Sequence, residues 1–493
     1  MSSATRNFSL LFFGALLFHL AGTWLIPLVD RDEPRFAEAS REMIERGDYV
    51  VPFFNDRYRF DKPPLTYWCQ VASYRLLGEN DFAARLPSAV AAALVAVALF
   101  AWGKRLGLAR AGFLAAIIFS LCLQVFIHAK AAVADMWLVL FVTLAHWAGE
   151  ELRRDRFAGS WRSAVFLPND TRRWWWILYL SLALGFLAKG PIGWMPLGTV
   201  AIMQLLRPVP QFGRRFLFVR GIFLTLAIVA LWGVPALLRT HGEFFAVGIG
   251  RHVVGRSLGA MEGHGSNSIL LSFAMLPFYF VTVFLSFAPW SLKLPWLTRR
   301  LWKNRDALDL YFIVGIAIVF IIFSLVRTKL PHYTLPAFPL LALLLARHWM
   351  EMETGVVRLK RWSIATAAVW LAVALVGFPL LAPYFPAAAL FKKAEPFLQP
   401  SMDFAARDFE EPSLVWVFRS RVRGWMIDDR ATSQPDELRK FLAGPGAHFI
   451  VVPTALADRL YQRLPDGYRR FSIRGFNIPK GRCVELTLIL KNA

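Results

Sequence analysis

Two adjacent carboxylates in the first polar segment of the chain are the strongest candidates for chemistry. Asp32 and Glu33 follow an apolar block, and Arg35 comes two residues later. Charged groups at the edge of a membrane span are costly unless they are used. A carboxylate there can act as a general base on an acceptor hydroxyl or amine, or can bind a metal ion. A structural interpretation stays open, in which Asp32 is the N-cap of a helix with Pro34 in its first turn.

Basic side chains suited to a phosphate occur in two further segments. Lys62 lies between Asp61 and two prolines. It is either a point charge that holds a phosphate or an interfacial lysine that snorkels to the membrane surface. The segment 239–268 combines Arg256 and His252 with several glycines, which suits a grip on a phosphate or diphosphate.

Three later positions carry isolated polar groups next to apolar blocks. Asp135 begins an apolar stretch, so it is either a functional residue or the ion-pair partner of Lys130. Lys189 is followed by Gly and Pro, which suits a tight turn or an interfacial anchor. Lys329 and Tyr333 belong to a second basic and aromatic segment.

The composition indicates that these residues belong to a membrane protein. Of 493 residues, 56% are hydrophobic and 18% are charged, whereas soluble domains carry about 25% charged residues. The net charge of +22 does not indicate nucleic acid, because most basic residues lie in short loops between apolar blocks. Three cysteines without CxxC spacing argue against a disulfide framework or a thiolate metal site. The sequence contains no GxGxxG or Walker motif, so it does not indicate a soluble nucleotide cofactor.

Apolar blocks long enough to cross a bilayer recur through residues 1–383. They lie near 8–28, 87–103, 111–127, 133–149, 174–189, 190–206, 217–238, 269–291, 311–326, 332–346 and 363–382. Several are short and contain Gly or Pro, so we expect about 11–13 transmembrane helices. Residues 67–77 mix polar with apolar side chains, which favours a helix lying in the membrane interface.

Basic loops set the expected orientation. The clusters begin at Lys104, Arg153, Arg207, Arg299 and Arg358. If residues 67–77 do not cross the membrane, all five basic clusters lie on the same side as the N-terminus. By the positive-inside rule, that side is cytoplasmic. The candidate residues then lie on the outer face, which is periplasmic in a bacterial inner membrane.

The composition changes after residue 383. Residues 415–418, 449–452 and 484–490 are expected to form strands, and 435–442 and 455–464 to form helices. The sequence therefore predicts two domains. Residues 1–383 form a transmembrane domain with catalytic outer loops 29–86 and 239–268, and residues 384–493 form a small periplasmic α/β domain.

Short motifs occur in a fixed order through most of the membrane part. They are Asp32-Glu33-Pro34-Arg35-Phe36-Ala37-Glu38, Ser40-Arg41-Glu42-Met43, Gly47-Asp48, Val51-Pro52, Asp61-Lys62-Pro63, Ala84-Arg85-Leu86-Pro87, Asp135, Lys189-Gly190, His252 with Arg256, and Lys329-Leu330-Pro331 with Tyr333. Together they resemble the lipid A 4-amino-4-deoxy-L-arabinose transferases, in the protein O-mannosyltransferase-like branch of the GT-C glycosyltransferases. The resemblance implies a polytopic α-helical GT-C fold.

The resemblance also implies roles for individual residues. It makes Asp32 the catalytic candidate, with Glu33 and Asp135 as further acids of the active site. The substrate- or phosphate-binding side chains that it implies are Arg35, Lys62, Lys189, Arg256, Lys329 and Tyr333. A divalent metal between Asp61 and His252 is a further implication, although the lipid A enzyme has Glu at the position of Asp61. No other cofactor is implied.

The reaction implied by the resemblance is an inverting sugar transfer. The donor is a polyprenyl (undecaprenyl-type) phosphate sugar, and the acceptor is lipid A or another cell-envelope lipid or glycan. A protein O-glycosyltransferase and an oligosaccharide ligase stay open as alternatives. A lipid or solute transporter or flippase is the alternative from another class, but the sequence has no internal repeat and its polar residues gather on one face. Membrane lipids and the lipid donor are the expected partners, and nucleic acid is not.

Overall fold

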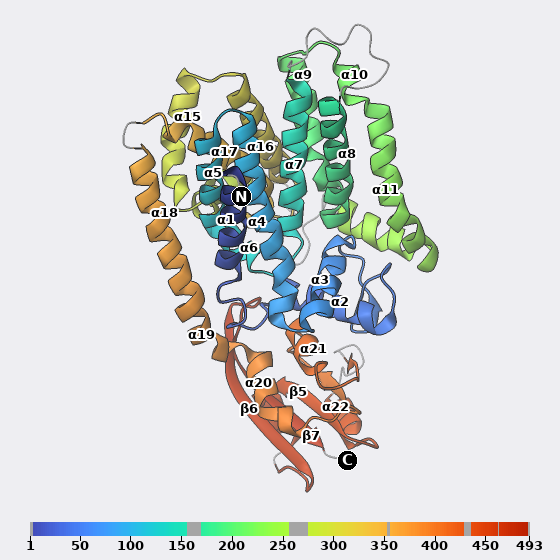
Figure 1. Ribbon diagram of the computed structural model, residues 1–493. Helices are drawn as coiled ribbons and strands as arrows, with labels where there is room; N and C mark the ends of the chain where they lie inside the picture. The colour runs from blue at the N-terminus through green and yellow to red at the C-terminus, as the bar shows by residue number, and fades with distance from the viewer. Residues whose placement is uncertain are drawn as a thin grey trace.

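Figure 1 shows the structure, a computed structural model that describes residues 3–154, 169–255, 275–352, 355–427, 435–461 and 463–491. A bundle of long helices lies at one end of the molecule and a small α/β unit lies at the other. Between them are α2 (Asp32–Arg46) and α3 (Leu65–Leu77). The predicted polytopic helical architecture with a C-terminal α/β unit is confirmed.

The helices of the bundle follow the apolar blocks of the sequence. In chain order they are α1 (Ser3–Leu20), α4 (Asp81–Arg105), α5 (Ala109–Leu121), α6 (Leu123–Ala129), α7 (Asp135–Arg153), α8 (Asn169–Lys189), η1 (Pro191–Trp194), α9 (Met195–Leu206), α10 (Phe212–Phe216), α11 (Phe218–Arg239), η2 (Phe244–Gly255), α14 (Phe278–Ser286), η3 (Trp290–Lys293), α15 (Leu294–Lys303), α16 (Ala307–Leu325), η4 (Pro331–Ala337), α17 (Phe338–Trp349), α18 (Gly355–Ala372), η5 (Val373–Gly377), α19 (Phe378–Leu381) and η6 (Ala382–Tyr384). Each predicted block contains helix in its described residues.

Some of these helices are straight spans and others are broken. Within the described residues, four are long and apolar enough to cross a membrane, and six are if each bent pair counts as one span. The four are Asp81–Arg105, Phe212–Arg239, Ala307–Leu325 and Gly355–Tyr384. One bent pair turns by 70° after Leu121, and the other turns by 117° after Ser286. This count is lower than the predicted one because the remaining blocks form helices that are short or charged at an end.

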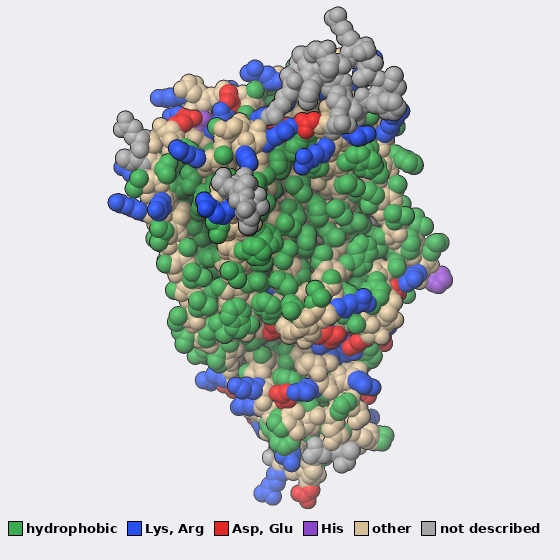
Figure 2. Space-filling view, viewed as in Figure 1, with side chains coloured by type: hydrophobic (Ala, Val, Ile, Leu, Met, Phe, Trp, Pro, Cys, Tyr) green, Lys and Arg blue, Asp and Glu red, His purple; other side chains and the backbone are tan. Residues whose placement is uncertain are grey.

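The surface of the bundle has the character expected of a membrane protein. Figure 2 shows a continuous hydrophobic belt with Lys and Arg side chains gathered above and below it. The short helices α10 and α15, which carry two of the predicted basic clusters, lie at the end away from the C-terminal unit (Figure 1). This arrangement agrees with basic loops on one side and the candidate residues on the other.

The C-terminal unit is a mixed sheet flanked by helices. Its strands are β3 (Asp403–Ala406), β4 (Met426–Ile427), β5 (His448–Pro453), β6 (Tyr468–Asn477) and β7 (Arg482–Lys491), in the order β4-β3-β5-β7-β6. Strand β3 is parallel to β4 and β5, and β7 is antiparallel to β5 and β6. The helical segments are α20 (Pro386–Ala394), η7 (Glu395–Phe397), α21 (Pro412–Phe418), α22 (Pro435–Ala443) and α23 (Thr454–Leu460).

Most of the predicted elements of this unit are confirmed, and one is wrong. The strands expected at 449–452 and 484–490 are β5 and β7, and the expected helices are α22 and a shorter α23. Residues 415–418, predicted as a strand, end the helix α21 instead. Pro412 fits the first turn of that helix. Because most of α21 is buried, its side chains form an unbroken apolar run, which cannot be distinguished from a buried strand by periodicity.

Helix α21 joins the C-terminal unit to α2. The buried carboxylate of Glu38 forms ion pairs with Arg41 of its own helix and with Arg419 beyond α21. Arg41 also donates to the carbonyl of Trp416 at 2.7 Å and stacks over its ring at 4.4 Å. A hairpin, β1 (Phe53–Phe54) with β2 (Arg57–Tyr58), completes the outer segment between α2 and α3.

Candidate active site

A polar cavity of about 60 Å³ lies where α2, α7, α8 and η4 meet. Three carboxylates line it, from Asp32, Asp61 and Asp135. The cationic side chains around it are Arg59, Lys62 and Lys189, and His332 and Tyr333 close one wall. Five of the residues predicted as catalytic or phosphate-binding therefore meet in one place: Asp32, Lys62, Asp135, Lys189 and Tyr333.

Helix ends position the charges of this cavity. Asp32 and Asp135 are the first residues of α2 and α7, where the positive end of the helix dipole favours a carboxylate. Lys189 is the last residue of α8, where the negative end favours an ammonium. The N-cap interpretation of Asp32 is wrong, because Arg31 occupies that position and no side chain caps the helix.

Asp135 is paired across the cavity with Lys189. The ammonium Nζ lies 2.6 Å from the carboxylate Oδ1, and the Asp135 side chain is buried. The alternative that Asp135 pairs with Lys130 is wrong. Lys130 instead donates to the carbonyls of Phe18 at 2.7 Å and Ala21 at 2.7 Å, at the end of α1. Lys130 is therefore a helix C-cap, and Asp135 belongs to the cavity.

Glu33, for which a catalytic role is expected, does not line the cavity. Its carboxylate is buried and accepts hydrogen bonds from Arg85 at 2.9 and 2.8 Å. The same carboxylate accepts from the backbone N–H of Ala132 at 2.6 Å and of Val29 at 2.7 Å. A carboxylate with four donors already in place holds the backbone together rather than meeting a substrate.

Two predicted phosphate-binding residues also lie elsewhere. Lys329 is buried and donates to the carbonyls of Phe323 at 2.9 Å and Ser324 at 2.6 Å, at the end of α16. It caps that helix and does not line the cavity, and among the described residues Arg35 does not line it either. Arg256 and the side chain of His252 lie outside the described residues.

Sequence reasoning missed Arg59, which is central to the wall of the cavity. Its guanidinium forms an ion pair with Asp61 at 3.2 Å, and its Nε donates to the Tyr67 hydroxyl at 3.0 Å. Burial raises the pKa of Tyr67, so the phenol is neutral and accepts that bond. The sequence could have indicated this pair, because Arg59 and Asp61 are two residues apart just before α3, and residues two apart in an extended segment share a face.

The metal implied between Asp61 and His252 stays a prediction. Asp61 lines the cavity, which suits a ligand, but its carboxylate already neutralises Arg59. A divalent cation there would compete with that guanidinium.

An apolar cavity of about 560 Å³ opens beside the polar one. The two share lining side chains of Asp61, Lys62, Asp135, Lys189, His332 and Tyr333. Apolar residues of α8, α11, α16 and η4 form much of the rest of its wall, among them Phe186, Trp232 and Phe323. The combined space has a charged end and a hydrophobic end, which match the charged phosphate and the hydrophobic tail of a lipid phosphate.

Comparison with known proteins agrees with the resemblance read from the sequence. The family described as dolichyl-phosphate-mannose-protein mannosyltransferase matches residues 61–234. An undecaprenyl phosphate-alpha-4-amino-4-deoxy-L-arabinose arabinosyl transferase from Erwinia tasmaniensis is 30% identical over 384 residues, covering 75% of this chain and 66% of the relative. A second such transferase, from Sodalis glossinidius, is 32% identical over 68% of this chain and 58% of its own length.

The structures agree over a longer stretch than the sequences do. The crystal structure of ArnT from Cupriavidus metallidurans bound to undecaprenyl phosphate matches with a TM-score of 0.76, over 98% of both chains, at 18% identity. The chain belongs to this family of GT-C membrane glycosyltransferases. The family resemblance predicted from the short motifs is confirmed. In sequence, the chain aligns to about two thirds or less of the length of the two curated transferases.

Proposed function

We propose that this GT-C family member transfers a sugar from a polyprenyl-phosphate donor of the undecaprenyl type to a lipid A-like or other cell-envelope acceptor. The observation that carries the proposal is the joined pair of cavities, with Lys62 and Lys189 at the junction. A donor phosphate at the junction would meet both ammonium groups. Its polyprenyl tail would occupy the apolar cavity, which is lined by helices of the bundle.

The reaction that this geometry supports is a direct displacement at the anomeric carbon. The nucleophilic atom of the acceptor forms a bond to that carbon, and the bond from the carbon to the phosphate oxygen breaks. The electron pair stays on the leaving polyprenyl phosphate. Positive groups fixed where that charge develops lower the barrier, which is the role of Lys62. Asp32 orients the acceptor and accepts its proton where it carries one.

The same proposal includes the orientation of the protein. We place the cavity and the C-terminal unit on the periplasmic face of a bacterial inner membrane. Basic clusters at the far end of the bundle support this placement through the positive-inside rule. Labelling of engineered cysteines from outside the cell tests it: positions in 30–60 should react and positions in 299–305 should not.

Replacement of Lys62 tests the mechanism. Lys62→Ala should lower turnover by about a hundredfold or more, because it removes a donor to a developing anion. Lys62→Arg should retain part of the activity, because the positive charge persists although the planar guanidinium group fits less well than the ammonium group. The matched control is Lys303→Ala, which removes an exposed lysine at the end of α15. Turnover is measured as transfer of labelled sugar from polyprenyl phosphate in proteoliposomes, normalised to protein.

The outcomes separate the proposed enzyme from its alternatives. Normal turnover in Lys62→Ala would show that Lys62 only snorkels, and the phosphate role would be abandoned. Movement of labelled lipid across the bilayer without transfer to any acceptor would favour a flippase. Mass spectrometry of lipid A and envelope glycolipids from a deletion strain identifies the acceptor, and an unchanged lipid A with an altered glycoprotein would favour a protein O-glycosyltransferase.

A further inference from the structure

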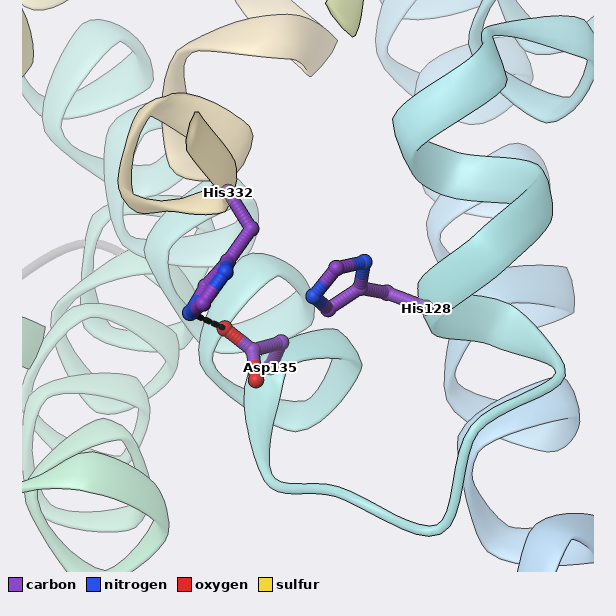
Figure 3. A group of neighbouring side chains, drawn as sticks. All are labelled: His128, Asp135 and His332. Atoms are coloured by element: carbon purple, nitrogen blue, oxygen red, sulfur yellow. Dashed lines mark ion pairs between the residues drawn. The ribbon is translucent and has the colours of Figure 1, made fainter. Parts of the chain in front are cut away.

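A cluster of two histidines and one carboxylate lies at the edge of the polar cavity. His128, Asp135 and His332 each offer a ligand atom, and these atoms lie within 4.8 Å of one another. Figure 3 shows the three side chains pointing toward one another from different parts of the chain. His128 is near the end of α6, Asp135 begins α7, and His332 belongs to η4. The reaction proposed above gives no role to either histidine.

The two imidazoles are held in orientations that suit metal ligands. Nδ1 of His128 lies 3.1 Å from the backbone oxygen of Gln124, one helical turn earlier, and 3.1 Å from the side-chain Nε2 of the same residue. In the tautomer whose Nδ1–H donates to that carbonyl, Nε2 is unprotonated and can bind a metal ion, an arrangement that is common behind metal-binding histidines. Nε2 of His332 lies 4.0 Å from Oδ1 of Asp135, and the two histidine rings are 4.8 Å apart.

The donor set selects a class of ion. Two imidazole nitrogens and one carboxylate oxygen are ligands for Zn²⁺ and similar borderline ions, rather than for Mg²⁺ or Ca²⁺. Around a tetrahedral Zn²⁺ with bonds of about 2.0 to 2.1 Å, ligand atoms lie about 3.3 Å apart. Side-chain rotations that bring the ligand atoms closer together by up to about 1.5 Å change the present spacing of at most 4.8 Å to that value. Asp135 and His332 also line the polar cavity, so the fourth position would face it.

Lys189 competes for the same carboxylate. Its ammonium lies 2.6 Å from Oδ1 of Asp135, and a cation held by that carboxylate would repel it. The ring of Tyr333 offers the ammonium a second position, since Nζ already lies 5.5 Å from its centroid. Lysine and metal are therefore alternative partners of one buried carboxylate.

We propose that His128, Asp135 and His332 form a site for a Zn²⁺-class divalent ion that opens onto the polar cavity and is in competition with Lys189. This site is distinct from the pair Asp61 and His252, and it does not rest on the proposed transferase activity. A bound ion would supply a Lewis acid at the end of the cavity where the donor phosphate is expected.

Titration of the purified full-length chain with Co²⁺ tests the site without donor or acceptor. Tetrahedral Co²⁺ absorbs visible light, so binding is read directly, and added Zn²⁺ should displace it. We expect one Co²⁺ per chain. His332→Gln and His128→Gln should each weaken binding at least tenfold, whereas Lys189→Met should strengthen it because the competing ammonium is gone. Asp61→Asn serves as the control and should leave the cobalt spectrum unchanged.

A cysteine variant keeps the test informative if the glutamine variants fold poorly. His332→Cys replaces one ligand by another, so Co²⁺ binding should persist and gain a thiolate charge-transfer band in the near ultraviolet. Absence of stoichiometric Co²⁺ binding in the wild type would overturn the proposal. So would binding that survives both histidine variants, or that disappears in Asp61→Asn, because the ion would then lie elsewhere.

Discussion

Arg85→Met is the sharpest test of whether Glu33 has a structural role, in contrast to the adjacent Asp32, which lines the cavity. Arg85 is buried in the first turns of α4 and donates to both carboxylate oxygens of Glu33. Its remaining N–H groups donate to the carbonyls of Thr23, Ile26 and Pro27 at 2.7, 2.7 and 2.9 Å. One side chain therefore fixes the segment between α1 and α2 against α4.

The magnitude of the effect follows from what the substitution leaves behind. Removing one partner of a buried ion pair typically costs about 3 to 5 kcal/mol, because the other charge stays buried without compensation. The carbonyls released by Arg85→Met add to that cost unless water reaches them. Glu33→Gln in the Arg85→Met background removes the stranded charge. The double variant should therefore be more stable than Arg85→Met alone, although less stable than the wild type.

The assay is unfolding of the purified protein in detergent, followed by tryptophan fluorescence during titration with a denaturing detergent. Arg110→Met is the matched control, because Arg110 is exposed near the start of α5 and should change stability little. Wild-type stability in Arg85→Met, combined with lost sugar transfer, would refute the structural role. Glu33 would then be a catalytic residue, as the sequence alone suggests.

Two further predictions concern the same segment. Asp32→Asn should abolish transfer of labelled sugar while detergent unfolding stays near wild type, because Asp32 lines the cavity and makes no cap; retained activity would remove Asp32 from the mechanism. Burial raises the pKa of Asp30 to about 7, so the folded chain binds this proton more tightly than the unfolded chain. The resulting stability is complete below about pH 4 and is lost as the pH rises through about 7. Melting temperatures at pH 5 and pH 8 should differ less in Asp30→Asn than in the wild type. Part of the dependence of the melting temperature on pH should remain in Asp30→Asn, because burial also raises the pKa of Glu42 to about 7.

The sequence predicted the features that depend on local pattern. Apolar blocks marked the helices of the bundle because a bilayer-spanning segment must be apolar over its whole length. Loop charge grouped the candidate residues on one face. The structure places three residues of that group, Asp32, Lys62 and Asp135, in one cavity although they are far apart in the chain. The orientation deduced from the same charges stays a prediction.

The predicted site residues that do not line the polar cavity have partners that are distant in sequence. Glu33 has the same residue type and neighbourhood as Asp32, and only the approach of Arg85 from α4 distinguishes them. Lys130 and Lys329 are lysines near membrane spans, as Lys62 is. Each, however, is bound to the carbonyls at the end of a helix, and no motif encodes which helix end lies within reach. His332 stood beside a predicted residue, Tyr333, but its partners come from α6 and α7.

The C-terminal unit contacts the turn before Asp32, although none of its described residues lines the polar cavity. The turn before Asp32 is held from the membrane side through Glu33 and Arg85. From the other side, the carboxylate of Asp30 accepts hydrogen bonds from the backbone N–H and the hydroxyl of Ser413, at 2.8 and 2.5 Å. Arg31 pairs with Glu411 at 3.2 Å, also beside α21. The position of Asp32 is thus set jointly by the bundle and by the C-terminal unit. Under the proposed mechanism, a displacement of α21 would therefore move the carboxylate that orients the acceptor.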